Sequence, residues 1–175
     1  MKKDFQGCVQ VYTGDGKGKT TAALGLIVRA LGAGFRVALV QFLKKGDYSE
    51  IRTLRRFEPQ LSIYQFHSGG FVRGHPDATV CRAVAEGWRW AREIIKSGEF
   101  QLVVLDEINV ALSLKLLSPE EVVSVLRERP SGVEVVLTGR NAPEEVIEFA
   151  DLVTEMRKLK HYYERGIPAR LGIEK

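Results

Sequence analysis

The sequence predicts an α/β fold in which helices cover a mostly parallel, doubly wound sheet of about six strands. Short apolar runs alternate along the chain with segments whose apolar residues recur at helical spacing. The run 37–40 is continuously apolar, which is typical of a strand buried on both faces of a parallel sheet. A glycine-rich loop lies between the first apolar run and the first helical segment.

The expected elements follow one another in strict alternation. Strands are expected over 8–12, 35–42, 61–66, 101–105, 133–137 and 151–156. Helices are expected over 20–31, 49–57, 77–97, 118–128 and 143–149. Several helix ends are marked: Asp77 and Ser118 can cap helix starts, and Gly98 can end a helix.

Composition favours an ordinary globular protein. The 175 residues are 45% apolar and 27% charged, which suits one domain over 1–175 with a C-terminal tail at about 157–175. No apolar run approaches the ~20 residues of a membrane span. Cys8 and Cys81 are far apart in sequence and predict reduced thiols in a cytoplasmic protein. The net charge of +4 is compatible with polyanionic small molecules and with weak nucleic-acid binding.

The glycine-rich loop runs from Thr13 to Thr21 and has the layout of a phosphate-binding loop. Glycines allow backbone N–H groups to surround an anion, and the start of the following helix adds its dipole. Lys19 would add a positive charge, and a threonine hydroxyl could bind Mg²⁺. The loop is one residue shorter than the usual pattern. A flexible basic turn is the less favoured alternative, because the motif and its flanking segments agree.

Three other polar groups follow predicted strands and should therefore meet at the same edge of the sheet. Asp106-Glu107 could bind Mg²⁺ or position a water molecule, Lys44-Lys45 carries positive charge, and Arg140 could contact a phosphate or be a turn residue. The loop 67–76 is either functional or a mobile surface loop.

Together these motifs resemble the P-loop type of ATP:corrinoid adenosyltransferase, also called cob(I)alamin adenosyltransferase. The matching stretches are TGDGKGKTTAALG, VALVQFLKKG, VVLDEINVAL, VVLTGRNAP, ADLVTEMRKLKHYYERG and ARLGIEK. The shortened glycine loop is the family's own form. The resemblance implies a RecA-like fold and transfer of the 5′-deoxyadenosyl group of ATP to the cobalt(I) of a reduced corrinoid, with release of triphosphate. It also implies Mg²⁺, a homodimer, an electron-donating reductase, and neither nucleic acid nor membrane as a partner.

The resemblance assigns site residues by position. Lys19, Thr20 and Glu107 would be catalytic, and Thr20, Glu107 and Asp106 would hold the metal. Phe71 and His161 would lie near the corrinoid. The residues implied to bind ATP are Gly14, Asp15, Gly16, Lys17, Gly18, Lys19, Thr20, Thr21 and Arg140.

The sequence departs from the family pattern at three points. Asp15 stands where asparagine is common, and Arg73 stands where an aromatic residue is common. The N-terminal extension of many relatives is also expected to be missing. Two other functions are compatible with the sequence: a RecA-like ATPase acting on nucleic acid, suggested by Arg52, Arg55 and Arg56, and a small-molecule kinase.

Overall fold

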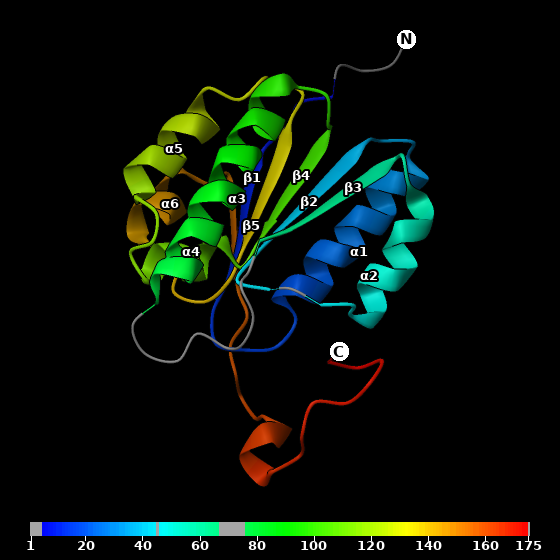
Figure 1. The fold of residues 1–175 in the computed structure, drawn as a ribbon, viewed down its shortest axis with the longest axis vertical. Coiled ribbons are helices and arrows are strands. Elements are labelled where there is room, and N and C mark those ends of the chain that lie inside the picture. The colour runs from blue at the N-terminus through cyan, green and yellow to red at the C-terminus, as the bar shows by residue number, and fades with distance from the viewer. Residues whose placement is uncertain (1–4, 45, 67–75, 175) are drawn as a thin grey trace.

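The computed structural model describes residues 5–44, 46–66 and 76–174 and shows a sheet of six strands (Figure 1). All the strand pairs are parallel, in the order β3-β2-β4-β5-β1-β6. The strands are β1 (Val9–Thr13), β2 (Val37–Phe42), β3 (Leu61–Phe66), β4 (Leu102–Asp106), β5 (Glu134–Thr138) and β6 (Leu152–Glu155). The expected α/β fold is therefore confirmed.

Helices cover both faces of the sheet, with α1 and α2 on one side and α3, α5 and α6 on the other (Figure 1). The helices are α1 (Lys19–Gly32), α2 (Ser49–Leu54), α3 (Ala78–Ser97), α4 (Ile108–Ser113), α5 (Pro119–Arg127) and α6 (Glu144–Phe149). Two 3₁₀ turns, η1 (Arg55–Phe57) and η2 (Tyr162–Arg165), complete the described elements. None of the helices in the described parts of the chain has the length and apolar content needed to cross a lipid bilayer.

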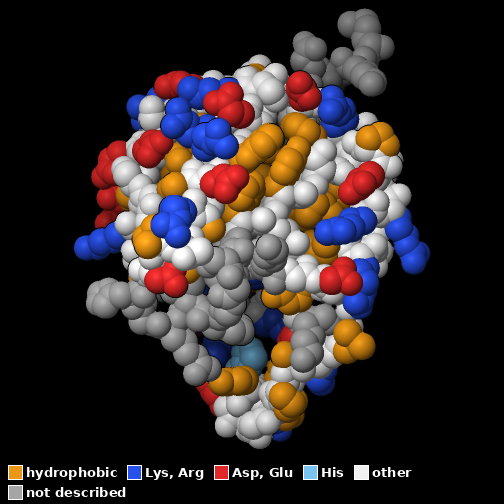
Figure 2. Space-filling view, viewed as in Figure 1, with side chains coloured by type: hydrophobic (Ala, Val, Ile, Leu, Met, Phe, Trp, Pro, Cys, Tyr) orange, Lys and Arg blue, Asp and Glu red, His pale blue; other side chains and the backbone are white. Residues whose placement is uncertain are grey.

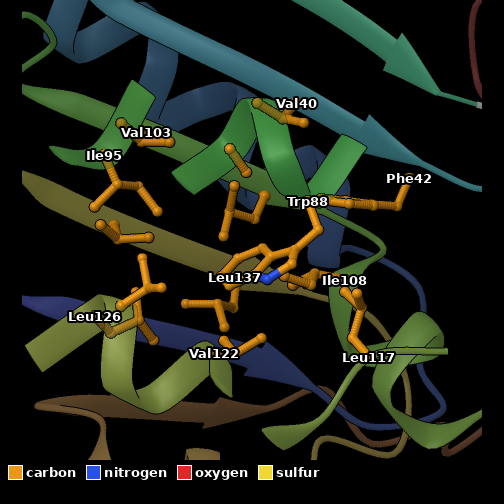
Figure 3. Packing of buried hydrophobic residues seen from close by; sticks show 14 of the residues in the cluster. Val40, Phe42, Trp88, Ile95, Val103, Ile108, Leu117, Val122, Leu126 and Leu137 are labelled. Carbon is orange, nitrogen blue, oxygen red and sulfur yellow. The ribbon is translucent and has the colours of Figure 1, made fainter. Parts of the chain in front are cut away.

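Alternation along the strands divides the core into two layers, because successive side chains of a strand point to opposite faces. In β4, Val103 and Leu105 pack in the cluster beneath α3 and α5, together with Trp88 (Figure 3). Leu102 and Val104 of the same strand pack in the cluster beneath α1 and α2. Burial on both faces explains why β2 and β4 consist almost wholly of apolar residues.

The structure contains one helix that the sequence pattern did not predict, and one predicted helix is shorter than expected. The six-residue helix α4 begins two residues after β4 and was not expected. The helix expected over 49–57 is α-helical only to Leu54 and then tightens into η1.

Because all six strands are parallel, their carboxyl ends lie at one edge of the sheet. The register aligns particular residues there: Gln41 of β2 is opposite both Gln65 of β3 and Asp106 of β4. The segment after β6 extends beyond this edge and returns toward it at the C-terminus (Figure 1). The fold thus gathers the glycine loop, three strand ends and the tail in one region.

Candidate active site

The glycine loop is packed closely against the chain that leaves β6. The N–H of Gly16 donates to the carbonyl of Met156 at 2.6 Å, and the N–H of Met156 donates to the carbonyl of Thr13 at 2.8 Å. A Cβ added at Gly14 or at Gly16 would lie 2.6 Å from the Met156 carbonyl oxygen. Gly14 and Gly18 also have positive φ angles of 93° and 124°. Glycine is therefore required at Gly14 and Gly16 for the close approach to Met156, and at Gly14 and Gly18 for the positive φ angle.

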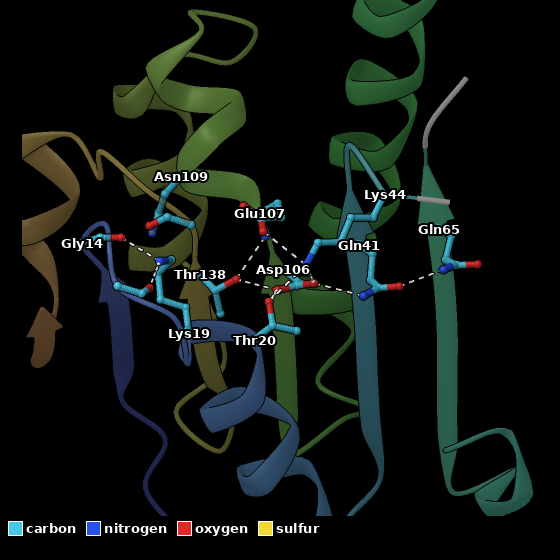
Figure 4. Close-up of polar contacts among 12 residues, drawn as sticks. Gly14, Lys19, Thr20, Gln41, Lys44, Gln65, Asp106, Glu107, Asn109 and Thr138 are labelled. Atoms are coloured by element: carbon cyan, nitrogen blue, oxygen red, sulfur yellow. Dashed lines mark hydrogen bonds and ion pairs between the residues drawn. The ribbon is translucent and has the colours of Figure 1, made fainter. Parts of the chain in front are cut away.

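Lys19 is the first residue of α1, and its side chain turns back into the loop. Its Nζ donates to the carbonyl oxygens of Gly14 at 2.6 Å and Gly16 at 2.7 Å (Figure 4). Burial lowers the pKa of Lys19, and the positive charge of Arg140 lowers it further. The loop thus holds an ammonium group at the start of a helix, where a phosphate group would gain from both charge and dipole.

Asp106 is fully buried, and each of its two oxygens accepts two hydrogen bonds. Thr20 and Thr138 donate to Oδ1 at 2.9 and 2.7 Å, and Gln41 and Lys44 donate to Oδ2 at 3.0 Å each (Figure 4). Burial alone would raise the pKa of this carboxyl, but the Lys44 ammonium and the hydrogen bonds lower it. Asp106 is therefore a carboxylate whose charge and orientation are fixed by its neighbours.

A second glutamine, Gln65, orients the Gln41 amide that donates to Asp106. Gln65 Nε2 donates to Gln41 Oε1 at 2.8 Å and to the Gly46 carbonyl at 3.2 Å. Because the Gln41 oxygen is occupied in this way, its amide nitrogen faces Asp106. These contacts follow from the strand register, which places Gln65 of β3, Gln41 of β2 and Asp106 of β4 side by side. Gln41 was not predicted as a site residue, although it is a polar residue at the end of an otherwise apolar strand.

Lys44 connects the residues expected to bind metal. Its Nζ lies 3.1 Å from the Thr20 hydroxyl, 3.0 Å from Asp106 Oδ2 and 3.2 Å from Glu107 Oε1 (Figure 4). Burial alone would lower the pKa of Lys44, but the two carboxylates raise it well above its ordinary value. The sequence placed Lys44 at a strand end, and the structure shows that its ammonium is the cation on which these three oxygens converge.

The same oxygens suit a divalent ion such as Mg²⁺, which prefers oxygen ligands. Glu107 has a left-handed backbone conformation, with φ at 65°, and its N–H donates to the Thr138 hydroxyl at 3.1 Å. In the described parts of the chain, no cluster of three or more His, Cys, Asp or Glu side chains could hold a metal. A metal here would have two carboxylates and a hydroxyl from the protein, and would need phosphate or water oxygens as well. The donor set fits a nucleotide-bound Mg²⁺ on these terms, with the Lys44 ammonium as a stand-in cation.

The other predicted phosphate residues lie around this centre. Arg140 is exposed just after β5, close enough for its charge to act on Lys19. Thr21 is exposed on α1, whereas Thr20 contacts Asp106. Asp15 is exposed and lines a small cavity together with Glu155, Arg157, Lys158 and Leu159, and its charge acts on Lys158.

Lys17 contacts the tail. Its Nζ lies 2.7 Å from a carboxylate oxygen of Glu174 and 2.9 Å from the hydroxyl of Tyr162. Hydrogen bonds to these two groups raise the pKa of Lys17, and Arg170 shares the Glu174 carboxylate at 3.0 Å. A role for Lys17 in phosphate binding stays a prediction. We call this contact of Lys17, Tyr162, Arg170 and Glu174 the tail latch.

Of the two residues expected near the corrinoid, the structure describes His161, which is not part of this cluster. His161 lies on the tail, where its Nδ1 accepts the N–H of Tyr163 at 3.1 Å and its ring lies 4.7 Å from that of Tyr162. Phe71 lies outside the described residues, as does Arg73. The structure therefore brings together Lys19, Thr20, Asp106 and Glu107 but does not test the corrinoid residues.

A groove of about 970 Å³ lies elsewhere on the molecule, along α3, α4 and α5. Its lining includes Trp88, Leu117 and Glu121 but no residue of the glycine loop. Trp88 already donates to Glu121 at 2.9 Å. We place the candidate site at the glycine loop because the charged groups converge there.

Comparison with known proteins identifies the family. The family model for ATP:corrinoid adenosyltransferase BtuR/CobO/CobP matches residues 5–174. The chain belongs to this family. A corrinoid adenosyltransferase of Escherichia coli strain K12 is 37% identical over 98% of this chain and 87% of its own length. Those of a Sinorhizobium species and of Pseudomonas aeruginosa are 42% and 39% identical, over 99% and 98% of this chain and 82% and 85% of their own lengths.

The comparison with solved structures supports the fold. The flagellar accessory protein FlaH from Methanocaldococcus jannaschii superposes with a TM-score of 0.60 over 86% of this chain and 71% of its own. The sequence identity is 11%, so the likeness bears on architecture alone. It agrees with the RecA-like arrangement expected for this adenosyltransferase.

Proposed function

We propose that this adenosyltransferase transfers the 5′-deoxyadenosyl group of ATP to the cobalt(I) of a reduced corrinoid and releases inorganic triphosphate. The observation that carries the proposal is the family match over residues 5–174. The geometry agrees with it, since the Lys19 ammonium lies within the glycine loop and the neighbouring Thr20 donates to Asp106 at the end of β4.

The reaction needs little covalent work from the protein. The electron pair of cobalt(I) forms a bond to C5′ of ATP, the C5′–O bond breaks, and its electrons leave with the triphosphate. No proton has to be removed, so no general base is required. The corrinoid supplies the nucleophile, and the protein must stabilise the charge that develops on the leaving group and keep cobalt and C5′ in line.

The glycine loop is the proposed binding site of the triphosphate. Lys19 would neutralise it, the N–H groups from Gly14 to Thr21 would contact its oxygens, and Arg140 would bind from the end of β5. We expect ATP to lie in reversed polarity compared with an ordinary nucleotide loop, so that C5′ is exposed to attack. The electrostatic field at the start of α1 then acts on the group that departs.

Thr20, Asp106 and Glu107 are the residues that would hold Mg²⁺ beside the triphosphate. Bound there, Mg²⁺ supplies positive charge to the leaving group. Asp106 would also hold the Thr20 hydroxyl in place, as it already does at 2.9 Å.

The C-terminal tail is the proposed cover of the corrinoid. Figure 2 shows a hollow between the body of the molecule and the tail. Several tail side chains are apolar or aromatic yet exposed: Leu159 is 87% exposed, and Tyr163 and Leu171 are each 74% exposed. Burial against a large flat ligand would remove this surface from water. His161 and Phe71 would face the corrinoid in this arrangement.

We further propose a homodimer in the cytoplasm that receives its reduced corrinoid from a reductase. The exposed apolar residues of the edge strand β6, Leu152 at 44% and Val153 at 41%, support a protein contact there. The reductase follows from the chemistry, because cobalt(I) must be generated by an electron donor.

The two alternative functions are not favoured by the family comparison. A kinase would transfer the γ-phosphoryl group and produce ADP. A nucleic-acid-dependent ATPase would need a continuous basic surface, and Arg52 contacts Asp47 of its own segment at 3.4 Å.

Product analysis tests the proposal. Purified protein is incubated with Mg-ATP and chemically reduced cobalamin, and the adenosylated product and the phosphate product are both quantified. Equal amounts of adenosylcobalamin and triphosphate are expected. Lys19→Ala should abolish turnover, whereas Lys96→Ala, a change on the exposed side of α3, should not. Formation of ADP, or no adenosylated product, would contradict the proposed function.

A further inference from the structure

Lys44 is held by the residues to which the proposed function assigns the metal. Its ammonium lies within 3.2 Å of three oxygens, one from each of Thr20, Asp106 and Glu107. A metal bound directly by these oxygens would need the space that the ammonium occupies. The metal and Lys44 therefore compete for one position.

The contacts of Asp106 support this competition. The carboxylate accepts from Thr20 and Thr138 at Oδ1 and from Gln41 and Lys44 at Oδ2, which fills its usual four acceptor positions. Thr138 and Gln41 extend from the ends of neighbouring strands and are buried. Lys44 lies beyond the end of β2 and retains a side-chain exposure of 26%. Of these three donors, Lys44 therefore has the most freedom to leave.

We propose that Lys44 closes the divalent-cation site in the nucleotide-free protein and is displaced only when the metal arrives together with the triphosphate. The displaced ammonium moves to the triphosphate, which offers it a new anionic partner. Its charge already acts on Lys19, the residue that the proposed function assigns to the triphosphate. This inference rests on the proposed role of the three oxygens as metal ligands. It adds that the metal binds together with the nucleotide and not before it.

The physical reason for displacement is charge. Mg²⁺ alone would have to expel a cation and leave it without its two carboxylate partners. Mg²⁺ bound to ATP brings a triphosphate that compensates the expelled ammonium. Lys44 is then a positioning residue that makes metal binding depend on the nucleotide.

Binding of Mn²⁺ without nucleotide tests the inference, with free Mn²⁺ measured by electron paramagnetic resonance. Lys44→Met removes the competing cation and should bind Mn²⁺ at least about tenfold more tightly than the unmodified protein, since one charge at hydrogen-bond distance readily accounts for that factor. Lys96→Met is the matched control and should bind like the unmodified protein. Adding Glu107→Gln to Lys44→Met should remove the gain, which assigns it to this site. Lys44→Gln keeps hydrogen-bond donors to Asp106 and serves if Lys44→Met does not fold.

Affinity for Mn-ATP should change in the opposite direction. Lys44→Met loses a partner of the triphosphate, so the ratio of Mn-ATP affinity to Mn²⁺ affinity should fall below that of the unmodified protein. In the unmodified protein, Mn²⁺ without nucleotide should leave acetylation of Lys44 relative to Lys96 unchanged, read by peptide mass spectrometry. Unchanged Mn²⁺ affinity in the folded Lys44 variants, or increased acetylation of Lys44 on adding Mn²⁺ alone, would overturn the inference. Neither readout needs a corrinoid or turnover, so this failure is distinct from failure of the proposed function.

Discussion

Replacing Gly16 by alanine tests whether the glycine loop depends on its close contact with the chain after β6. The added Cβ would lie 2.6 Å from the carbonyl oxygen of Met156 and 2.9 Å from the carbonyl carbon of Arg157. Both atoms are backbone, so no side chain can rotate to relieve the contact. The loop must move away from Met156, and the hydrogen bond from the Gly16 N–H at 2.6 Å is weakened or lost.

The expected cost follows from these two contributions. Overpacking of a tight contact costs about 1–3 kcal/mol, and loss of a backbone hydrogen bond costs about 1 kcal/mol. Gly16→Ala should therefore lower the free energy of unfolding by about 2–4 kcal/mol, measured by urea denaturation. Affinity for ATP should fall as well, because the displaced loop no longer holds Lys19 at the start of α1.

Gly25→Ala is the matched control. Gly25 lies in the interior of α1, and an added Cβ there meets no atom within 4 Å. Alanine is the better helix former by about 1 kcal/mol, so this variant should be more stable than the unmodified protein. The two substitutions are chemically identical and should move stability in opposite directions. If Gly16→Ala were as stable as Gly25→Ala, the packing explanation for the loop glycines would be refuted.

Three further predictions concern charge, capping and the tail. Burial and the charge of Arg140 lower the pKa of Lys19 below the ordinary lysine value of 10.5, so its ammonium loses its proton at a lower pH than that of an ordinary lysine. Affinity for ATP, measured by calorimetry, should therefore fall as pH rises toward 10.5, and a pH profile left unchanged by Lys19→Met would contradict this role of Lys19. Asp77→Ala removes a side chain that accepts two backbone N–H groups at the start of α3, so it should lower the free energy of unfolding by about 1 kcal/mol, measured by urea denaturation. Asp77→Asn should lower it less, and equal losses in the two variants would argue against capping. Glu174→Gln should loosen the tail latch and speed proteolysis of the tail without moving the urea midpoint; equal protection would show that the contact with Lys17 does not restrain the tail.

Alternation of apolar runs was enough to predict the six strands, because each buried strand is short and bounded by polar residues. Helix α4 was missed for a physical reason: six residues beginning soon after β4 are too short to establish a helical period. The strand expected over 35–42 begins two residues later in the structure, since β2 starts at Val37.

Part of the candidate site could be predicted and part could not. Parallel strands place their carboxyl ends together, so the meeting of the glycine loop with Asp106 and Glu107 was expected. The contact between Gln41 and Asp106 depends on β2 lying next to β4, and alternation alone does not fix the order of strands. The contact of Lys17 with Glu174 spans nearly the whole chain, and no local pattern predicts it.

The tail latch has a practical consequence for how this enzyme is handled. Glu174, the last described residue, touches Lys17 of the glycine loop, so a label attached at Glu174 would lie beside the proposed triphosphate site. The first described residue, Phe5, instead packs against Phe35 with ring centroids 5.0 Å apart, ahead of β2 and at the opposite edge of the sheet. A label attached near Phe5 would therefore lie away from the edge that carries the glycine loop.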